Sequence, residues 1–190
     1  PCVPEQDVLG ADVVVQEPLS FSLGDREGAP KLGQFSRHSY LLHPASAVPY
    51  TRRAPLLIQL PPNQGPDLPK LEAYIGELRE LSGDSWRIAV EFRDDRWLEP
   101  PTYKLLDRLS VALCIHDMAR RAATDEPNDA PFVYMRRHGS SDQLYAGSYS
   151  PERIQSDANR IKGWNAQGRD VYVYYNNDIE VSAVENAQQT

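Results

Sequence analysis

The sequence predicts a single α/β domain built from successive β-strand and α-helix units with parallel strands. Residues 55–190 alternate short apolar runs with segments of helical periodicity, which is typical of parallel βα units. Each apolar run also changes to polar or charged residues at its C-terminal end. With 190 residues, the chain is long enough for one domain with a substantial core.

Five strands and four helices are expected in this part of the chain. The strands are expected at residues 55–62, 87–93, 111–117, 132–139 and 170–178. The helices are expected at residues 67–83, 102–109, 150–168 and 180–188. Asp67 is a suitable N-cap for the first helix and Gly83 a suitable stop. In the third helix, Ser150 is a suitable N-cap, Pro151 lies in the first turn and Gly168 is a suitable stop.

The apolar pattern supports these elements in turn. Two prolines stop the first strand, PLLIQLPP, and the strand VALCIHD shows no polar alternation until its end. The first helix carries one apolar stripe, formed by Leu68, Leu71, Tyr74, Ile75, Leu78 and Leu81. The stripe of the third helix is formed by Ile154, Ala158, Ile161 and Trp164.

Residues 1–54 differ from the rest. They are rich in proline, glycine and serine, and they contain only two runs that are compatible with strands, DVVVQ (12–16) and HSYLLH (38–43). A loop of this length is unusual inside a compact domain. We therefore expect an atypical or truncated N-terminal segment that is poorly structured, followed by the α/β part from residue 55.

Composition narrows the classes of function. No run of about 18 apolar residues and no signal-peptide pattern is present, so no membrane association is expected. The net charge of −7 argues against a global attraction to nucleic acid, although a local basic patch stays compatible with it. Cys2 and Cys114 do not suggest a disulfide framework, which makes a cytoplasmic location the default. No Cys/His spacing predicts a zinc site.

Polar residues end all five expected strands. They are Gln59, Glu91, Arg93, His116, Asp117, Arg136, His138 and the run Asn176 to Asp178. Parallel strands bring their C-terminal ends to one edge of a sheet, which is the active face of an α/β barrel and the ligand edge of an open sheet. The sequence therefore predicts a site at this edge.

Two pairs of residues, each spaced two apart, dominate the predicted site. Glu91 and Arg93 share a strand face, so they form either an acid/base or metal-ligand carboxylate beside an anion clamp, or a structural ion pair. Arg136 and His138 repeat this spacing, and His138 is a candidate general base or metal ligand. Arg137 is expected to point outward and to be structural.

The remaining strand ends have two interpretations each. Asp117 is either a helix cap or a catalytic group, and we favour the site, with His116 on the opposite, structural face. Asn176 and Asn177 are either turn residues or amides that orient a ligand. Asp178 alternatively caps the last helix.

Basic and aromatic residues at this edge indicate an anionic ligand. Guanidinium groups recognise phosphate and carboxylate, and the arginines concerned are Arg93, Arg96, Arg120, Arg121, Arg136 and Arg137. Trp97, Tyr145 and Tyr149 are near in sequence and are candidates for stacking on a base or sugar, although ordinary packing is the favoured interpretation for Trp97.

Four motifs resemble, in this order, blocks of the domain-of-unknown-function 72 family, which is also called YecE-like. They are PLLIQLPP, IAVEFRDDRWL, FVYMRRHG followed by YAGSYSPERI, and DVYVYYNND. The resemblance covers roughly residues 52–190 and implies the last five βα units of a TIM-like (β/α)8 barrel. The opening motifs of the family are absent from residues 1–54. A barrel that is incomplete would need a partner chain, an oligomer or a rearranged N-terminal segment.

These observations lead to three hypotheses of function. The first is an enzyme of hydrolase or lyase type that acts on a phosphate-bearing or nucleic-acid ligand, with Glu91, Asp117 and His138 as catalytic residues. The ligand-binding candidates are Arg93, Arg136, Asn176, Asn177 and Tyr149. The alternatives are a non-catalytic module for an anionic ligand or nucleic acid, and a truncated chain without a working site. A divalent metal is compatible with the carboxylates, but no motif requires one.

Overall fold

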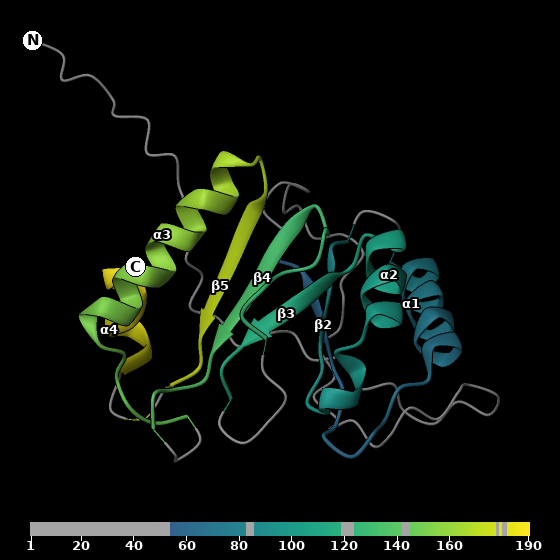
Figure 1. Ribbon diagram of the computed structural model, residues 1–190, viewed down its shortest axis with the longest axis horizontal. Helices are drawn as coiled ribbons and strands as arrows, with labels where there is room; N and C mark the ends of the chain where they lie inside the picture. The colour runs from purple at the N-terminus through teal and green to yellow at the C-terminus, as the bar shows by residue number, and fades with distance from the viewer. Residues whose placement is uncertain (1–53, 83–85, 119–123, 142–144, 178, 180–181) are drawn as a thin grey trace, which may run out of the picture.

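A five-stranded parallel sheet forms the centre of the computed structural model of the chain (Figure 1). The structure describes residues 54–82, 86–118, 124–141, 145–177, 179 and 182–190. The strands lie in sequence order and are β1 (Leu56–Gln59), β2 (Ile88–Glu91), β3 (Ala112–His116), β4 (Phe132–Arg137) and β5 (Asp170–Tyr175). The sheet curls like one side of a barrel, so the predicted α/β class and all five strands are confirmed.

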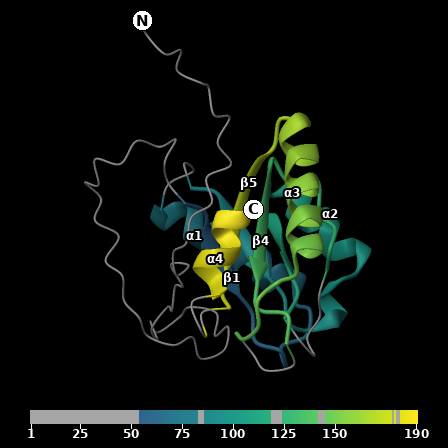
Figure 2. The ribbon, with the colours of Figure 1, turned by 90° about the vertical axis from the view of Figure 1, so that its left-hand side faces the viewer.

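Helices flank the sheet in two groups. They are α1 (Leu68–Ser82), α2 (Pro100–Arg108), α3 (Pro151–Ala166) and α4 (Ser182–Gln189). Helices α1 and α2 lie together at the β1 end of the sheet, whereas α3 and α4 pack against β5 (Figures 1 and 2). A short 3₁₀-helix, η2 (Asp95–Trp97), which the sequence did not predict, precedes α2. No helix in the described ranges is long and apolar enough to cross a membrane.

The helix ends follow the expected capping signals. The Asp67 carboxylate accepts a hydrogen bond from the Lys70 main-chain N–H, and the Ser150 hydroxyl accepts one from that of Arg153. Gly168, with φ of 79°, lies just beyond α3 in a conformation that favours glycine. Helix α2 starts two residues earlier than expected, because prolines are well tolerated in a first helical turn. Gly83 lies outside the described residues.

Residues alternate between the two faces of the sheet, so that each face has its own apolar packing. The outer face packs on the helices through two groups of buried side chains, one with α1 and α2 around Ile58, Val90 and Leu113, and one with α3 and α4 around Met135 and Val173. The inner face is filled by Leu57, Ala89, Ala112, Cys114, Phe132, Tyr134 and Tyr174. We call the residues of each strand that face inward the inner series and those that face the helices the outer series. A residue at a strand end points to the face of the series that it continues.

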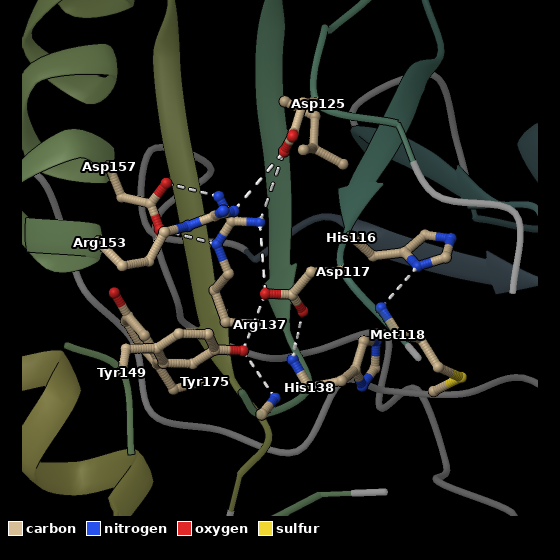
Figure 3. A network of polar contacts seen from close by, with 12 residues as sticks. His116, Asp117, Met118, Asp125, Arg137, His138, Tyr149, Arg153, Asp157 and Tyr175 are labelled. Atoms are coloured by element: carbon tan, nitrogen blue, oxygen red, sulfur yellow. Dashed lines mark hydrogen bonds and ion pairs between the residues drawn. The ribbon is translucent and has the colours of Figure 1, made fainter. Parts of the chain in front are cut away.

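A buried ion pair fixes α3 to β4 on the outer face. The guanidinium of Arg137 donates two hydrogen bonds to the carboxylate of Asp157, at 2.8 and 2.5 Å, and both side chains are buried (Figure 3). The structure thus confirms that Arg137 points outward. Such a pair contributes little when intact, but the loss of one partner leaves an uncompensated charge in the core.

We expect Asp157→Asn to lower the free energy of unfolding by about 3 kcal/mol, because the buried Arg137 guanidinium loses its main counter-charge. The measurement is chemical denaturation at neutral pH. Glu72→Gln is the matched control, since Glu72 also accepts two hydrogen bonds from one arginine, Arg108, but at the surface. Surface pairs are screened by water, so the control should unfold like the unsubstituted chain. Equal effects of the two substitutions would contradict the structural role of Arg137.

Candidate functional site at the carboxyl edge of the sheet

A buried carboxylate lies at the centre of the carboxyl edge. Glu91, the last residue of β2, is fully buried. Its Oε1 accepts a hydrogen bond from Arg93 Nε at 2.7 Å, and its Oε2 accepts one from an Arg136 terminal nitrogen at 2.6 Å. The structure therefore brings the predicted pair Glu91 and Arg93 together with Arg136 of the other predicted pair.

Two further residues complete this arrangement. The Gln59 amide oxygen at the end of β1 accepts hydrogen bonds from Arg93 at 2.8 Å and from Arg136 at 3.2 Å. Gln59 is also the register partner of Glu91 in the sheet. His138 lies with its Nε2 at 3.8 Å from Glu91 Oε2. We call Gln59, Glu91, Arg93, Arg136 and His138 the Glu91 cluster.

The neighbours of Glu91 favour its ionised form. Burial raises the pKa of Glu91, but the neighbouring His138, Arg136, His116 and Arg93 outweigh it and hold that pKa well below its ordinary value. An ionised carboxylate that already accepts two charge-assisted hydrogen bonds is a weak proton acceptor. Its geometry suits positioning of the arginines better than the acid/base role that the sequence suggested.

His138 lies beside Glu91 as a buried imidazole. Its side chain is buried, and neither ring nitrogen has a hydrogen-bond partner within the described part of the chain. Burial lowers the pKa of His138 below its ordinary value of 6.5, and the opposing attraction of Glu91 does not restore it. An imidazole whose pKa is lowered by burial beside a carboxylate is suited to accept or relay a proton.

The side of the sheet predicted for His116 was wrong. His116 pairs in register with Arg136, so it continues the inner series, and its ring lies 6.0 Å from that of His138. Both of its nitrogens are occupied: Nε2 lies 2.9 Å from the Phe92 carbonyl oxygen, and Nδ1 accepts the Met118 main-chain N–H at 3.4 Å. This pattern places the proton on Nε2 and leaves no ring nitrogen for a ligand.

Asp117 lies one residue further, on the helix side of the same edge (Figure 3). Its carboxylate accepts hydrogen bonds from the His138 main-chain N–H and from the Tyr149 hydroxyl, both at 2.9 Å. The Tyr149 hydroxyl in turn accepts the Gly139 main-chain N–H at 2.6 Å. Asp117 and Tyr149 therefore hold the start of the loop after β4, outside the Glu91 cluster.

The two asparagines after β5 point to different places. The buried Asn177 amide donates to the Gly147 carbonyl at 2.9 Å and to the Asn186 side chain on α4 at 2.9 Å, so it joins loop and helix. Asn176 binds the Arg137 carbonyl through its main-chain N–H at 2.7 Å, and its side-chain oxygen is buried without a partner among the described residues. Asp178 lies outside the described residues.

Not all of the predicted basic residues contribute to the cluster. The exposed Arg96 is paired with the buried carboxylate of Asp94, and Arg137 faces α3. Arg120 and Arg121 lie outside the described residues. In the described ranges, no group of three or more His, Cys, Asp or Glu residues is arranged to hold a metal ion. Sequence reasoning noted Gln59 only as a polar strand end, and pairing of the strands was the missing signal that links it to Glu91.

The sheet and its polar edge define a parallel β/α protein of barrel type with a candidate site at the carboxyl ends of the strands. The chain belongs to the family described as "Protein of unknown function DUF72", whose model matches residues 27–190. The match begins before residue 55 and so includes part of the segment that we expected to be atypical. The comparison with curated proteins finds no significant match.

Crystal structures of DUF72 family proteins share this fold. One from Enterococcus faecalis aligns with a TM-score of 0.61 at 20% identity, over 71% of this chain and 56% of that chain. One from Thermotoga maritima aligns with a TM-score of 0.56 at 24% identity, over 73% and 56%. The chain thus spans little more than half the length of these proteins. At such identities the likeness shows the fold alone.

Acid is expected to destabilise the protein in two steps. Because the folded-state pKa of His138 is lowered, the unfolded chain binds its proton more readily, and stability falls as the pH drops below about 6.5. The contribution of Glu91 is present above its unfolded pKa, near 4.5, and is lost as the pH falls further through its folded pKa. Urea denaturation between about pH 7.5 and pH 5 measures the first step.

His138→Gln removes the group responsible for the first step and should flatten the stability profile between those pH values. Each unit of pKa displacement corresponds to about 1.4 kcal/mol. A variant whose stability still declined like that of the unsubstituted chain would show that another group titrates there.

Proposed function

We propose that this protein binds a phosphate-bearing ligand at the Glu91 cluster. In a reaction of hydrolase or lyase type, His138 would exchange a proton with the bound ligand. Hydrolysis or elimination of a phosphate ester needs a group that neutralises the anion and a group that moves a proton. The cluster supplies both from positions two apart in the chain, Arg136 on β4 and His138 just after it, and both side chains face Glu91.

One observation supports the proposal most directly: the cluster has excess positive charge and unused donors. Two guanidinium groups face one carboxylate, which leaves one net positive charge when His138 is neutral. The Nε of Arg136 is buried and has no hydrogen-bond partner in the part of the chain that the structure describes. Buried donors are nearly always satisfied in proteins, so this one indicates a place for an acceptor.

The cluster also has a side that solvent reaches. The Arg93 side chain is 13% exposed, whereas those of Arg136 and Glu91 are buried. Arg93 is therefore the more accessible of the two arginines to an anion that arrives from solvent. Guanidinium groups bind phosphate through parallel hydrogen bonds, and their strength increases where water is excluded.

A non-catalytic binding module is the second candidate. The low pKa of Glu91 favours this candidate, because an ionised Glu91 does not act as a second acid or base. Proton transfer in the cluster then depends on His138 alone. Asp117, the other catalytic candidate of the sequence, is bound to Tyr149 and the main chain instead. Turnover therefore distinguishes the two candidates.

Inorganic phosphate should bind to the chain at low ionic strength, and Arg93→Gln should weaken it about tenfold or more, because one charge-assisted contact is lost. Isothermal titration calorimetry measures both affinities. Arg96→Gln is the control, since Arg96 is an arginine at the same edge that pairs with Asp94 away from the cluster. Equal affinities of the two variants, or no binding by the unsubstituted chain, would contradict the proposal.

Phosphomonoester turnover should depend on His138. With para-nitrophenyl phosphate as a general substrate, we expect His138→Gln to lower kcat about a hundredfold while the affinity for inorganic phosphate is kept, because general acid–base catalysis contributes factors of this size. Phosphate binding without any turnover by the unsubstituted chain would favour the binding module.

A further inference from the structure

We propose that the ligand of the Glu91 cluster carries a planar aromatic ring beside its phosphate group, and that Tyr145 recognises this ring. The inference rests on the proposed function, since it requires an anion at the cluster, and it adds the chemical class of the ligand. Three aromatic residues are near this edge in the sequence: Trp97, Tyr145 and Tyr149.

Trp97 is committed to the core. It is buried, and its ring stacks on Phe92 with centroids 4.7 Å apart and planes 9° apart. The indole N–H donates to the Gln64 carbonyl at 2.7 Å. The expectation that Trp97 packs rather than binds is therefore confirmed, and its stacking capacity is used inside the fold.

Tyr149 is also occupied. Its buried ring contacts that of Tyr175 at 5.9 Å between centroids. Its hydroxyl donates to Asp117 and accepts from the Gly139 main chain, so its polar end has a structural task. Tyr149 was a ligand-binding candidate in the sequence, but these contacts favour a role in holding the loop after β4.

Tyr145 is the exposed residue of the three. Its exposed fraction is 37%, and its ring lies 5.7 Å from the ring of His138 at an interplanar angle of 65°. Its φ of 63° lies in the left-handed region, which few residues other than glycine adopt. The Tyr145 carbonyl accepts the Ile179 main-chain N–H at 3.4 Å, which ties this strained residue to the segment after β5.

Burial increases in steps from Tyr145 to the charged centre. Tyr145 is partly exposed, His138 is 2% exposed, and Glu91 is fully buried. A ligand that contacts both ends of this series must place its anionic group inside and its apolar part outside. The partly exposed Tyr145 at the outer end is suited to contact with a flat ring, because aromatic rings stack on the side chain of tyrosine.

The test compares three probes that differ in one property at a time: inorganic phosphate, cyclohexyl phosphate and phenyl phosphate. Calorimetry on the 190-residue chain should show that phenyl phosphate binds about tenfold more tightly than cyclohexyl phosphate. Tyr145→Leu should abolish the preference for the flat ring, and Tyr145→Phe should keep it. Ile179→Ala is the control, since Ile179 is an exposed apolar neighbour. Melting temperatures check that each variant is folded.

The outcomes separate this inference from the proposed function. Equal affinity for phenyl and cyclohexyl phosphate, or a preference that survives Tyr145→Leu, would overturn the role of Tyr145 while phosphate binding stands. A failure of all three probes to bind would overturn both. Loss of the preference in Tyr145→Leu alone, with binding of inorganic phosphate unchanged, is the result that the structure predicts.

Discussion

The ionised carboxylate of Glu91 is the constraint on which the carboxyl edge depends. A buried, unpaired carboxylate costs several kcal/mol, so cationic groups must face it from neighbouring strands. Arg93 meets this need from the segment just after β2 and Arg136 from β4, while Gln59 joins both to β1. The direction of Arg136 also decides that of His138, because residues two apart on a strand share a face.

On the outer face, too, a buried charge is paired with an opposite charge. Arg136, Arg137 and His138 are consecutive, and alternation sends the middle residue toward α3, where Asp157 neutralises it. One short basic run thus serves two layers: it supplies two groups to the candidate site and one anchor to the helix that follows the loop.

Local signals explain why the elements were predictable and the site only partly so. Hydrophobic periodicity and capping residues such as Asp67 and Ser150 act within a few residues, so strands and helices follow from the sequence. The face of a residue at a strand end depends on pairing with another strand, and a shift of one residue exchanges the faces. For this reason His116 and Asp117 were assigned to the wrong sides. Asn177 likewise binds α4, a contact that no local pattern encodes.

A double-mutant cycle between Glu91→Gln and Arg136→Met tests the central role of the buried carboxylate most directly. Each single substitution leaves a buried group without its partner, whereas the double variant removes both, so the two losses in free energy of unfolding should not add. We predict a coupling energy of about 2 to 3 kcal/mol from denaturation of the four proteins. Additivity to within about 0.5 kcal/mol would show that Glu91 and Arg136 act independently, and would contradict the account of this edge.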